Sequence, residues 1–137
     1  MNKSELIVNK MYDKDAFSKW LGITIVDIQK GYCKLSIDIS KNMLNGFGIA
    51  HGGITYSLAD SALAFAANTY GKQCLSIETS ISHFVSCEEG DVLTAVTREL
   101  SKTDKIAIYL ITIFNQSDKE VAIFKGTIYR TSKDWDY

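Results

Sequence analysis

The chain has 137 residues, of which 46% are hydrophobic and 23% charged, and its net charge is −1. This length is typical of a single domain and too short for a (β/α)8 barrel, and the composition excludes a disordered chain. Because the charges nearly cancel, the chain lacks the basic surface of a non-specific nucleic-acid binder, and we expect no nucleic-acid partner. No apolar run approaches the roughly 20 residues of a membrane span, so we expect no membrane partner either.

The cysteines favour neither a disulfide framework nor a metal site. The chain has three of them, Cys33, Cys74 and Cys87, and none forms a C-x-x-C pair. An odd count without that spacing predicts free, buried thiols and no bound metal. The first ten residues have no apolar segment long enough for a signal peptide. The expected compartment is therefore the cytoplasm, and no cofactor is indicated.

The first half of the chain predicts a helix, a hairpin and a second helix. A loose apolar stripe over residues 4–20 predicts an N-terminal helix that Ser4 caps and that ends before Gly22. Apolar residues that alternate with polar ones over residues 23–40 predict a β-hairpin. Residues 52–69 predict a central helix, and because this segment is apolar nearly all round, we expect it to be buried on most sides.

The second half predicts strands. Segments rich in Ile, Val, Thr and aromatic residues lie at 73–84, 92–100, 105–115 and 121–131. Their short connections indicate antiparallel neighbours. Residues 106–114 are apolar on both faces, so we expect one face to pack on the central helix and the other on a second copy of the sheet. The sequence therefore predicts one α+β domain over residues 1–137, an antiparallel sheet of about six strands around one apolar helix.

A glycine-rich loop leads directly into the central helix. Residues 42–53 contain four glycines in twelve positions, a density typical of backbone that turns tightly or lies close to a ligand. The N-terminus of the following helix offers unpaired N–H groups and a partial positive charge, which suit an oxyanion or a polarised carbonyl. Gly52 and Gly53 would let a substrate approach the backbone, and Asn45 would add an amide donor. The alternative is that the glycines only build a tight connection.

Asp60 is a charged residue in the most apolar stretch of the chain, residues 58–63. An aspartate is almost never fully buried without a partner, and desolvation raises the pKa of a carboxyl group, which is how a general base is made. The structural alternative is a solvated helix face or a buried hydrogen bond. We favour a functional role, because perturbed carboxylates cluster at active sites.

The spacing of Gly52 and Asp60 indicates a second subunit. The two residues are eight positions apart, about 12 Å along a helix. One helix cannot direct both groups at the same carbonyl carbon, so either they serve different substrates or two helices meet antiparallel across a dimer. In a dimer, Gly52 of one chain would face Asp60 of the other. Since the two-sided apolar strands also require a partner, we expect a homodimer or a dimer of dimers.

The loop and the helix together resemble the hotdog-fold thioesterases, and within them the phenylacetic acid degradation protein PaaI family. The likeness is carried by N-G-F-G-I-A-H-G-G at 45–53 and by L-A-D at 58–60, and it extends over most of the chain. The resemblance implies a hotdog fold, hydrolysis of acyl-CoA thioesters and an active site that is shared across a dimer.

The resemblance also implies roles for four residues. Asp60 corresponds to the carboxylate that activates water or attacks as a nucleophile. Gly52 corresponds to the backbone N–H that polarises the thioester carbonyl, and Asn45 to the assisting amide. Ser76 corresponds to a hydroxyl that orients the water or the carboxylate.

Substrate-binding candidates follow from the same resemblance. His51 matches the family histidine and, with Gly53, is a candidate substrate-binding residue. His51 either organises the carbonyl site or bonds the backbone to hold the glycine-rich turn, and we favour the second role. Where relatives have a basic residue and a proline, this chain has Val85 and Ser86, which argues against a phosphate contact there. The remaining candidate contacts to coenzyme A are Lys72, Lys125 and Arg130.

The main alternative to an enzyme is a hotdog module that binds acyl-CoA without hydrolysing it. Asp60 argues against this alternative, because a pure binder has no need of a carboxylate in an apolar helix. A Cys–His nucleophile pair and a dehydratase site find no support in the residue spacing. The sequence does not identify the acyl group; the aromatic side chains that would line its pocket, or simply fill the core, are Phe47, Tyr56, Phe65 and Phe84.

Overall fold

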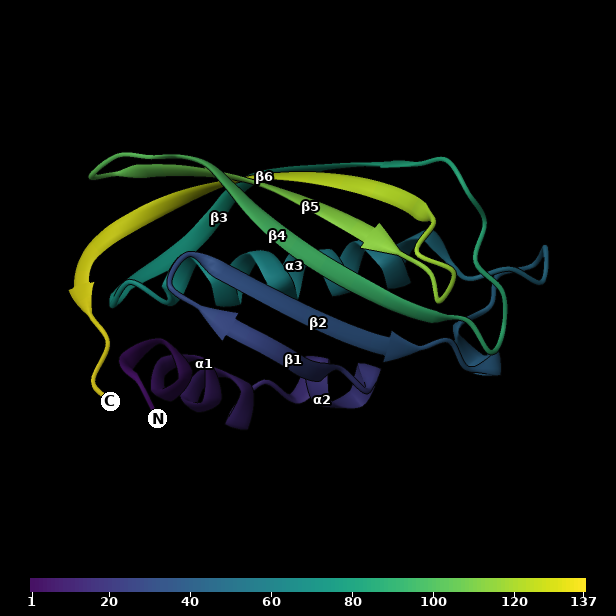
Figure 1. Cartoon of the computed structure of the whole chain (residues 1–137), viewed down its shortest axis with the longest axis horizontal. Coiled ribbons are helices and arrows are strands. Elements are labelled where there is room, and N and C mark those ends of the chain that lie inside the picture. The colour runs from purple at the N-terminus through teal and green to yellow at the C-terminus, as the bar shows by residue number, and fades with distance from the viewer.

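A six-stranded antiparallel sheet wraps around one long helix in the computed structural model, which describes all residues 1–137 (Figure 1). The strands lie in the order β1-β2-β4-β5-β6-β3. The helix is α3, Gly52–Asn68. The strands are β1 Thr24–Gln29, β2 Tyr32–Asp38, β3 Lys72–His83, β4 Val92–Lys102, β5 Ile106–Phe114 and β6 Glu120–Asp134. The predicted α+β architecture, an antiparallel sheet around one apolar helix, is confirmed.

The prediction of one N-terminal helix over residues 4–20 is wrong. The segment forms two helices, α1 (Lys3–Asp13) and α2 (Ala16–Leu21). Asp15 causes the break, because its carboxylate accepts the Ser18 N–H at 2.9 Å and so caps the start of α2. An aspartate stabilises a helix start more than a helix interior, which explains why the chain divides here.

Ser4 is not the N-cap of α1 either. Asn2 has that role, since its side chain accepts the Glu5 N–H at 2.9 Å and the Glu5 carboxylate accepts the Asn2 N–H in return. Ser4 is instead buried, and its hydroxyl donates to the Thr69 carbonyl at 3.1 Å, just after the end of α3. This bond fastens α1 to α3 across 65 positions of sequence, a distance that no local capping pattern covers.

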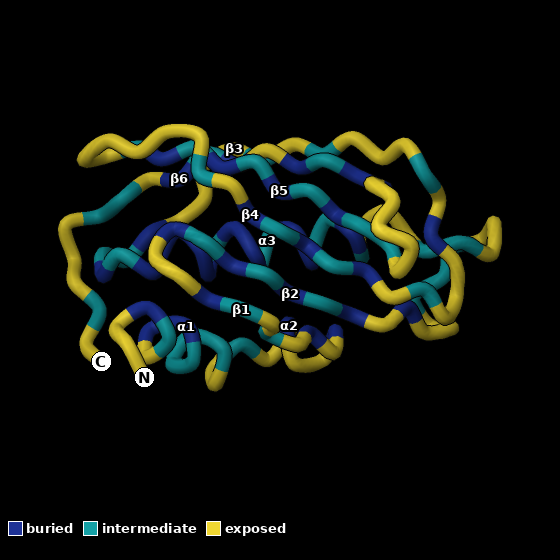
Figure 2. The backbone as a smooth tube through the Cα atoms, viewed as in Figure 1, coloured by how far each residue is buried: buried dark blue, intermediate teal, exposed yellow.

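The inner face of the sheet and α3 form the hydrophobic core (Figure 2). Nine of the 17 residues of α3 are buried, which confirms that this helix is covered on most sides. Helix and sheet approach closely where Gly126 of β6 faces Leu63, since a Cβ on Gly126 would clash with the Leu63 side chain. The bulkiest fully buried side chains of the core belong to Tyr109, Phe65 and Phe124.

The outer face of the sheet is apolar but not covered within one chain. Burial alternates along β5, so that Ala107, Tyr109 and Ile111 are buried while the residues between them are half-exposed. The half-exposed set includes Ile108 and Leu110. The packing of one face on α3 is therefore confirmed, and the packing of the other face on a second copy stays a prediction.

The two edges of the sheet are β1 and β3. Strand β3 pairs only with β6, and its side chains Leu75 and Ile77 are 67% and 61% exposed. An edge strand with unpaired backbone groups and exposed apolar side chains is a ready template for pairing with another chain.

The cysteine thiols lie where the sequence predicted. Cys33, Cys74 and Cys87 are all free and buried, as predicted. No three His, Cys, Asp or Glu side chains gather closely enough to hold a metal ion. None of the helices has the length and apolar character that crossing a bilayer requires.

Candidate active site

The glycine-rich loop is a tight turn that the Asn45 side chain holds together. It follows a short 3₁₀-helix, η1 (Lys41–Met43). The Asn45 side-chain oxygen accepts the N–H groups of Phe47 at 2.9 Å and Ile49 at 3.4 Å, and Gly48 takes the left-handed conformation at φ 78°. The amide nitrogen of Asn45 makes no hydrogen bond within the chain. Asn45 therefore builds the turn with its oxygen and keeps two N–H donors free.

His51 begins helix α3. Its ring Nδ1 accepts the Gly53 N–H at 2.9 Å, and a Cβ on Gly53 would lie only 3.1 Å from that nitrogen. The ring thus occupies the space that the second glycine leaves open, which supports the structural interpretation of His51. Binding of substrate by His51 and Gly53 stays a prediction. The Gly52 N–H, at the first position of the helix, has no acceptor in the chain.

A pocket of about 310 Å³ opens at this end of α3. It brings together Gly52 and Asn45, the two predicted donors, from the helix and from the loop. Val85 and Ser86 also line the pocket, so the two positions at which the family resemblance implied a basic residue and a proline carry no cation here. The full lining is Asn45, Ile49, Ala50, Gly52, Thr55, His83, Phe84, Val85, Ser86 and Cys87.

Two polar residues of the pocket were not among the predicted site residues. His83, the last residue of β3, places its Nε2 2.5 Å from the Thr55 hydroxyl in the first turn of α3. The Thr55 hydroxyl is also 3.0 Å from the Gly52 carbonyl, and the His83 ring lies 3.4 Å from where a Gly52 Cβ would be. These residues are 28 positions apart, so no spacing motif could have paired them.

Asp60 lies outside this pocket, two turns further along α3. Its side chain is half-buried and makes no hydrogen bond within the chain. Burial raises the pKa of this carboxyl above its ordinary value of 3.8. Both residues lie on the continuous helix α3, eight positions and hence about 12 Å apart along its axis, so one chain does not bring the two groups together.

Ser76 also lies outside the pocket of its own chain. It is exposed on the edge strand β3, where it pairs with Ile128 of β6 next to a β-bulge. Its role in orienting water or the carboxylate stays a prediction.

One of the four aromatic candidates lines the pocket. Phe84 does so and is 51% exposed. Phe47 is 90% exposed at the tip of the turn, and Phe65 is part of the core. Tyr56 packs edge-on against Phe124, with ring centroids 5.2 Å apart.

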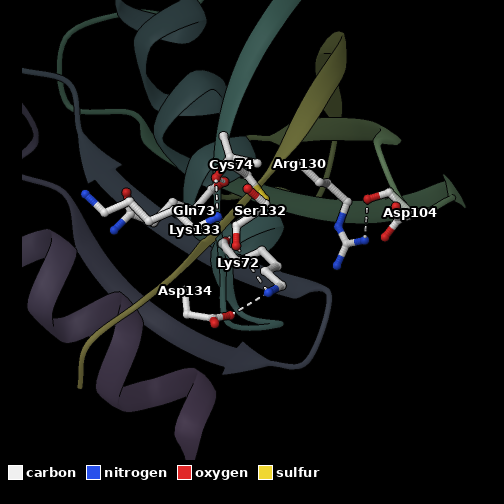
Figure 3. A network of polar contacts seen from close by, with 9 residues as sticks. Lys72, Gln73, Cys74, Asp104, Arg130, Ser132, Lys133 and Asp134 are labelled. Carbon is white, nitrogen blue, oxygen red and sulfur yellow. Dashed lines mark hydrogen bonds and ion pairs between the residues drawn. The ribbon is translucent and has the colours of Figure 1, made fainter.

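The three cationic candidates for coenzyme A have different surroundings. Lys72 is paired with Asp134 at 2.7 Å (Figure 3). Arg130 points away from that pair and donates to the carbonyls of Thr103 and Asp104 at 3.0 and 3.1 Å (Figure 3). Lys125 is exposed on β6 and makes no ion pair.

The fold and the helix-start pocket define a hotdog-fold protein of the thioesterase class. The sequence model of the thioesterase superfamily matches residues 47–122, which run from the glycine-rich loop into β6. The chain belongs to this superfamily, and its class is that of hydrolases acting on thioester bonds.

Individual relatives show that the chain is similar to PaaI proteins. It is 36% identical over 120 residues to acyl-coenzyme A thioesterase PaaI of Escherichia coli K12, covering 88% of this chain and 86% of that enzyme. The solved structure of the E. coli PaaI protein from the phenylacetic acid degradation operon superposes with a TM-score of 0.94 at 33% identity, covering 96% of each chain. The smu.793 protein of Streptococcus mutans UA159, bound to acetyl CoA, superposes with a TM-score of 0.79 at 26% identity, covering 82% of this chain and 91% of that one. The resemblance to hotdog thioesterases of the PaaI family is confirmed.

Proposed function

We propose that this protein hydrolyses acyl-CoA thioesters to a free acid and coenzyme A. The observation that carries the proposal is the pairing of two unused donors, the Gly52 N–H and the Asn45 amide, in one pocket at the N-terminus of α3. Donors aimed at a developing oxyanion are the largest single contribution in many acyl-transfer enzymes. The relatives supply the substrate class, since PaaI of E. coli is an acyl-coenzyme A thioesterase and the S. mutans protein binds acetyl CoA.

The proposed mechanism begins with the thioester carbonyl. Its oxygen accepts the Gly52 N–H, and the Asn45 amide assists. The partner's Asp60 then either takes a proton from water, whose oxygen attacks the carbonyl carbon, or attacks that carbon itself to form an anhydride that water cleaves. In both routes the carbon–sulfur bond breaks and the thiolate of coenzyme A leaves and takes up a proton. Ser76 orients the attacking water or the carboxylate.

This mechanism requires a dimer with antiparallel α3 helices. The free edge of β3, with its exposed Leu75 and Ile77, supports pairing at the side of the sheet that borders the site. The apolar outer face of β5 supports a further association into a dimer of dimers. Light scattering at micromolar concentration is expected to give a dimer or a tetramer, and a monomer would contradict the shared site.

A charge placed on the edge tests which surface forms the dimer. Ile77→Lys introduces a charge on β3, so we expect monomers without activity. Val26→Lys is the matched control, because Val26 is an exposed apolar residue on the opposite edge strand, β1. The control is expected to keep the oligomer and the activity. The reverse result would place the interface on the other edge.

The activity is tested by the release of free thiol from a panel of acyl-CoA substrates with aliphatic and aryl acyl groups. We expect turnover in the wild type and a strong loss in Asp60→Asn, which is nearly isosteric. Asp38→Asn removes an exposed carboxylate at the end of β2 and is the matched control for the loss of one charge. Tight binding of acyl-CoA without any release of thiol would instead identify a binding module.

A further inference from the structure

Three cations surround one aromatic ring at the end of the fold opposite the pocket. Tyr70 follows the C-terminal end of α3, and its ring centroid lies 4.4 Å from the Lys102 ammonium, 5.7 Å from Lys30 and 5.9 Å from the Arg130 guanidinium. Lys30 comes from the β1–β2 turn, Lys102 from the end of β4 and Arg130 from β6. These segments lie at the same end of the molecule as the C-terminal end of α3, on the left in Figure 1. We call this set the Tyr70 cluster.

The Tyr70 cluster is rigidly built. The Tyr70 hydroxyl donates to a Glu99 carboxylate oxygen at 2.8 Å, and the buried Tyr109 hydroxyl donates to the same oxygen at 2.8 Å. Burial and the bond to Glu99 raise the pKa of Tyr70 to about 12, so the phenol keeps its proton. The ring is therefore held in place by a carboxylate whose acceptor oxygen already serves two phenols.

The segments that carry the cations are also fixed. The Gly31 N–H donates to the Thr69 hydroxyl at 2.7 Å, which holds the β1–β2 turn, and hence Lys30, against the end of α3. Gly31 has φ 74°, and a Cβ there would come within 2.5 Å of the Tyr70 hydroxyl, so this close approach needs glycine. Arg130 is anchored by its two bonds to backbone carbonyls of the β4–β5 turn.

None of the three cations has an ion-pair partner. The chain contains one salt bridge, between Lys72 and Asp134, and it does not involve the cluster. The Glu99 carboxylate beside the ring balances part of the cations' charge, and three like charges around one ring remain unfavourable unless a further anion binds. Arg and Lys together are typical ligands of phosphate oxygens, and Lys30 and Lys102 are exposed and able to reach one.

We propose that the Tyr70 cluster binds a phosphate monoester, and that this group is the terminal phosphate of the coenzyme A whose thioester lies in the partner's pocket. The assignment of the ligand rests on the proposed function. In the antiparallel dimer, Gly52 of one chain faces the partner's Asp60. The partner's Tyr70 is ten residues beyond that Asp60, so in the proposed dimer it lies about 15 Å further along the axis, beyond the N-terminus of the first chain's α3. Coenzyme A carries its phosphates at the far end of an extended pantetheine arm, so the cluster lies where that arm leads.

The first experiment combines a change in the protein with a change in the substrate. The double variant Lys30→Gln/Lys102→Gln removes two charges from the protein, and a 3′-dephospho-acyl-CoA removes the monoester from the substrate. With acyl-CoA we expect the variant to raise KM about tenfold, or about 1.4 kcal/mol, and to keep kcat. With the dephospho substrate, the variant and the wild type are expected to have the same KM, because the interaction is already absent.

Lys133→Gln is the matched control. Lys133 is exposed near the end of the same strand as Arg130 but contacts no aromatic ring, and we expect this variant to leave both KM values unchanged (Figure 3). An equal rise in KM for both substrates would assign the lysines to another part of coenzyme A and overturn the monoester site. The absence of any rise with acyl-CoA would overturn the cluster as a ligand site.

A binding experiment separates failure of this proposal from failure of the proposed function. Adenosine 3′,5′-bisphosphate, which has no thioester, is titrated into the wild type and the double variant by calorimetry. We expect the wild type to bind it about tenfold more tightly, with an affinity that falls as salt is added. Inorganic phosphate as a competitor distinguishes a site for any phosphate from one that requires the nucleotide. Equal affinities of the two proteins would overturn the site, whether or not the wild type hydrolyses thioesters.

Discussion

The Thr55 hydroxyl connects His83 to the start of α3. It lies 2.5 Å from His83 Nε2 and 3.0 Å from the Gly52 carbonyl oxygen. A carbonyl only accepts, so the hydroxyl donates its proton to Gly52 and accepts the Nε2–H of His83. The last residue of β3 is thereby tied to the residue whose N–H we propose as the oxyanion donor.

Replacing Thr55 by valine tests this connection. Valine has nearly the same shape but leaves the Gly52 carbonyl and the His83 N–H without a partner, so we expect a loss of about 1–3 kcal/mol in unfolding free energy. A lower kcat/KM is expected as well, because the helix start is no longer held. Thr55→Ser keeps the hydroxyl and serves as the control in chemical denaturation and turnover assays. Equal stability of the valine variant would show that the hydroxyl is not a structural link.

Two substitutions at Asn45 separate its oxygen from its nitrogen. Asn45→Ala removes both the turn acceptor and the amide donor, whereas Asn45→Asp keeps an oxygen for the Phe47 and Ile49 N–H groups. We expect both to lower kcat about 10²-fold, the typical effect of losing one oxyanion donor. Only the alanine variant is expected to melt at a lower temperature. Full turnover in either variant would make the Asn45 amide dispensable for catalysis.

Asp60→Asn is expected to lower kcat by about 10²–10⁴-fold, as for other general bases. The wild-type rate should rise with pH as the carboxyl ionises. Because burial raises the pKa of Asp60, this rise in rate should be centred above pH 3.8, the ordinary pKa of an aspartate side chain. A rise centred at or below that pH would show that the N-terminus of the partner's helix, which favours the anion, lowers the pKa more than burial raises it.

The same variant has a predictable effect on stability. A carboxyl whose pKa is raised by folding binds its proton more tightly in the folded chain, so its contribution is most favourable at acidic pH. That contribution declines as pH rises from the unfolded pKa through the raised one. Asparagine has no such dependence. Asp60→Asn should therefore gain in melting temperature relative to wild type as the pH is increased from 4 to 7, and a constant difference would contradict a raised pKa.

Gly126→Ala tests the contact between sheet and helix. The added Cβ would meet the Leu63 side chain in the closed core between β6 and α3. We expect a loss of about 1–3 kcal/mol in unfolding free energy, as for other overpacked cores. Gly46→Ala is the control, because a Cβ at that position meets no atom within 4 Å. Leu63→Ala also destabilises the core, but its loss and that of Gly126→Ala should be less than additive in the double variant, because the methyl group fills part of the space that the leucine leaves.

The sequence patterns predicted the elements whose signals are local. The apolar segment at 52–69 became α3, and Gly22, with φ 81°, ends α2. The alternation over 23–40 became the β1–β2 hairpin. Hydrophobic periodicity and helix-terminating residues depend on residues that are close in sequence, which is why these elements were predictable. The division of the first helix was missed because Asp15 fits a capping position and a helix surface equally well until its bond to Ser18 is seen.

The motif around Gly52 and Asp60 was sufficient, with the resemblance it carries, to predict the hotdog fold and the thioesterase class. Only the tertiary structure decided which side chains surround the start of α3. There β3 places His83 in contact with Thr55, although the two residues are 28 positions apart in the sequence. It likewise decided that Lys72 is paired with Asp134, while Arg130 joins the Tyr70 cluster. Such contacts between distant residues depend on strand register and on the packing of the sheet around α3. These are properties of the whole chain rather than of any short segment.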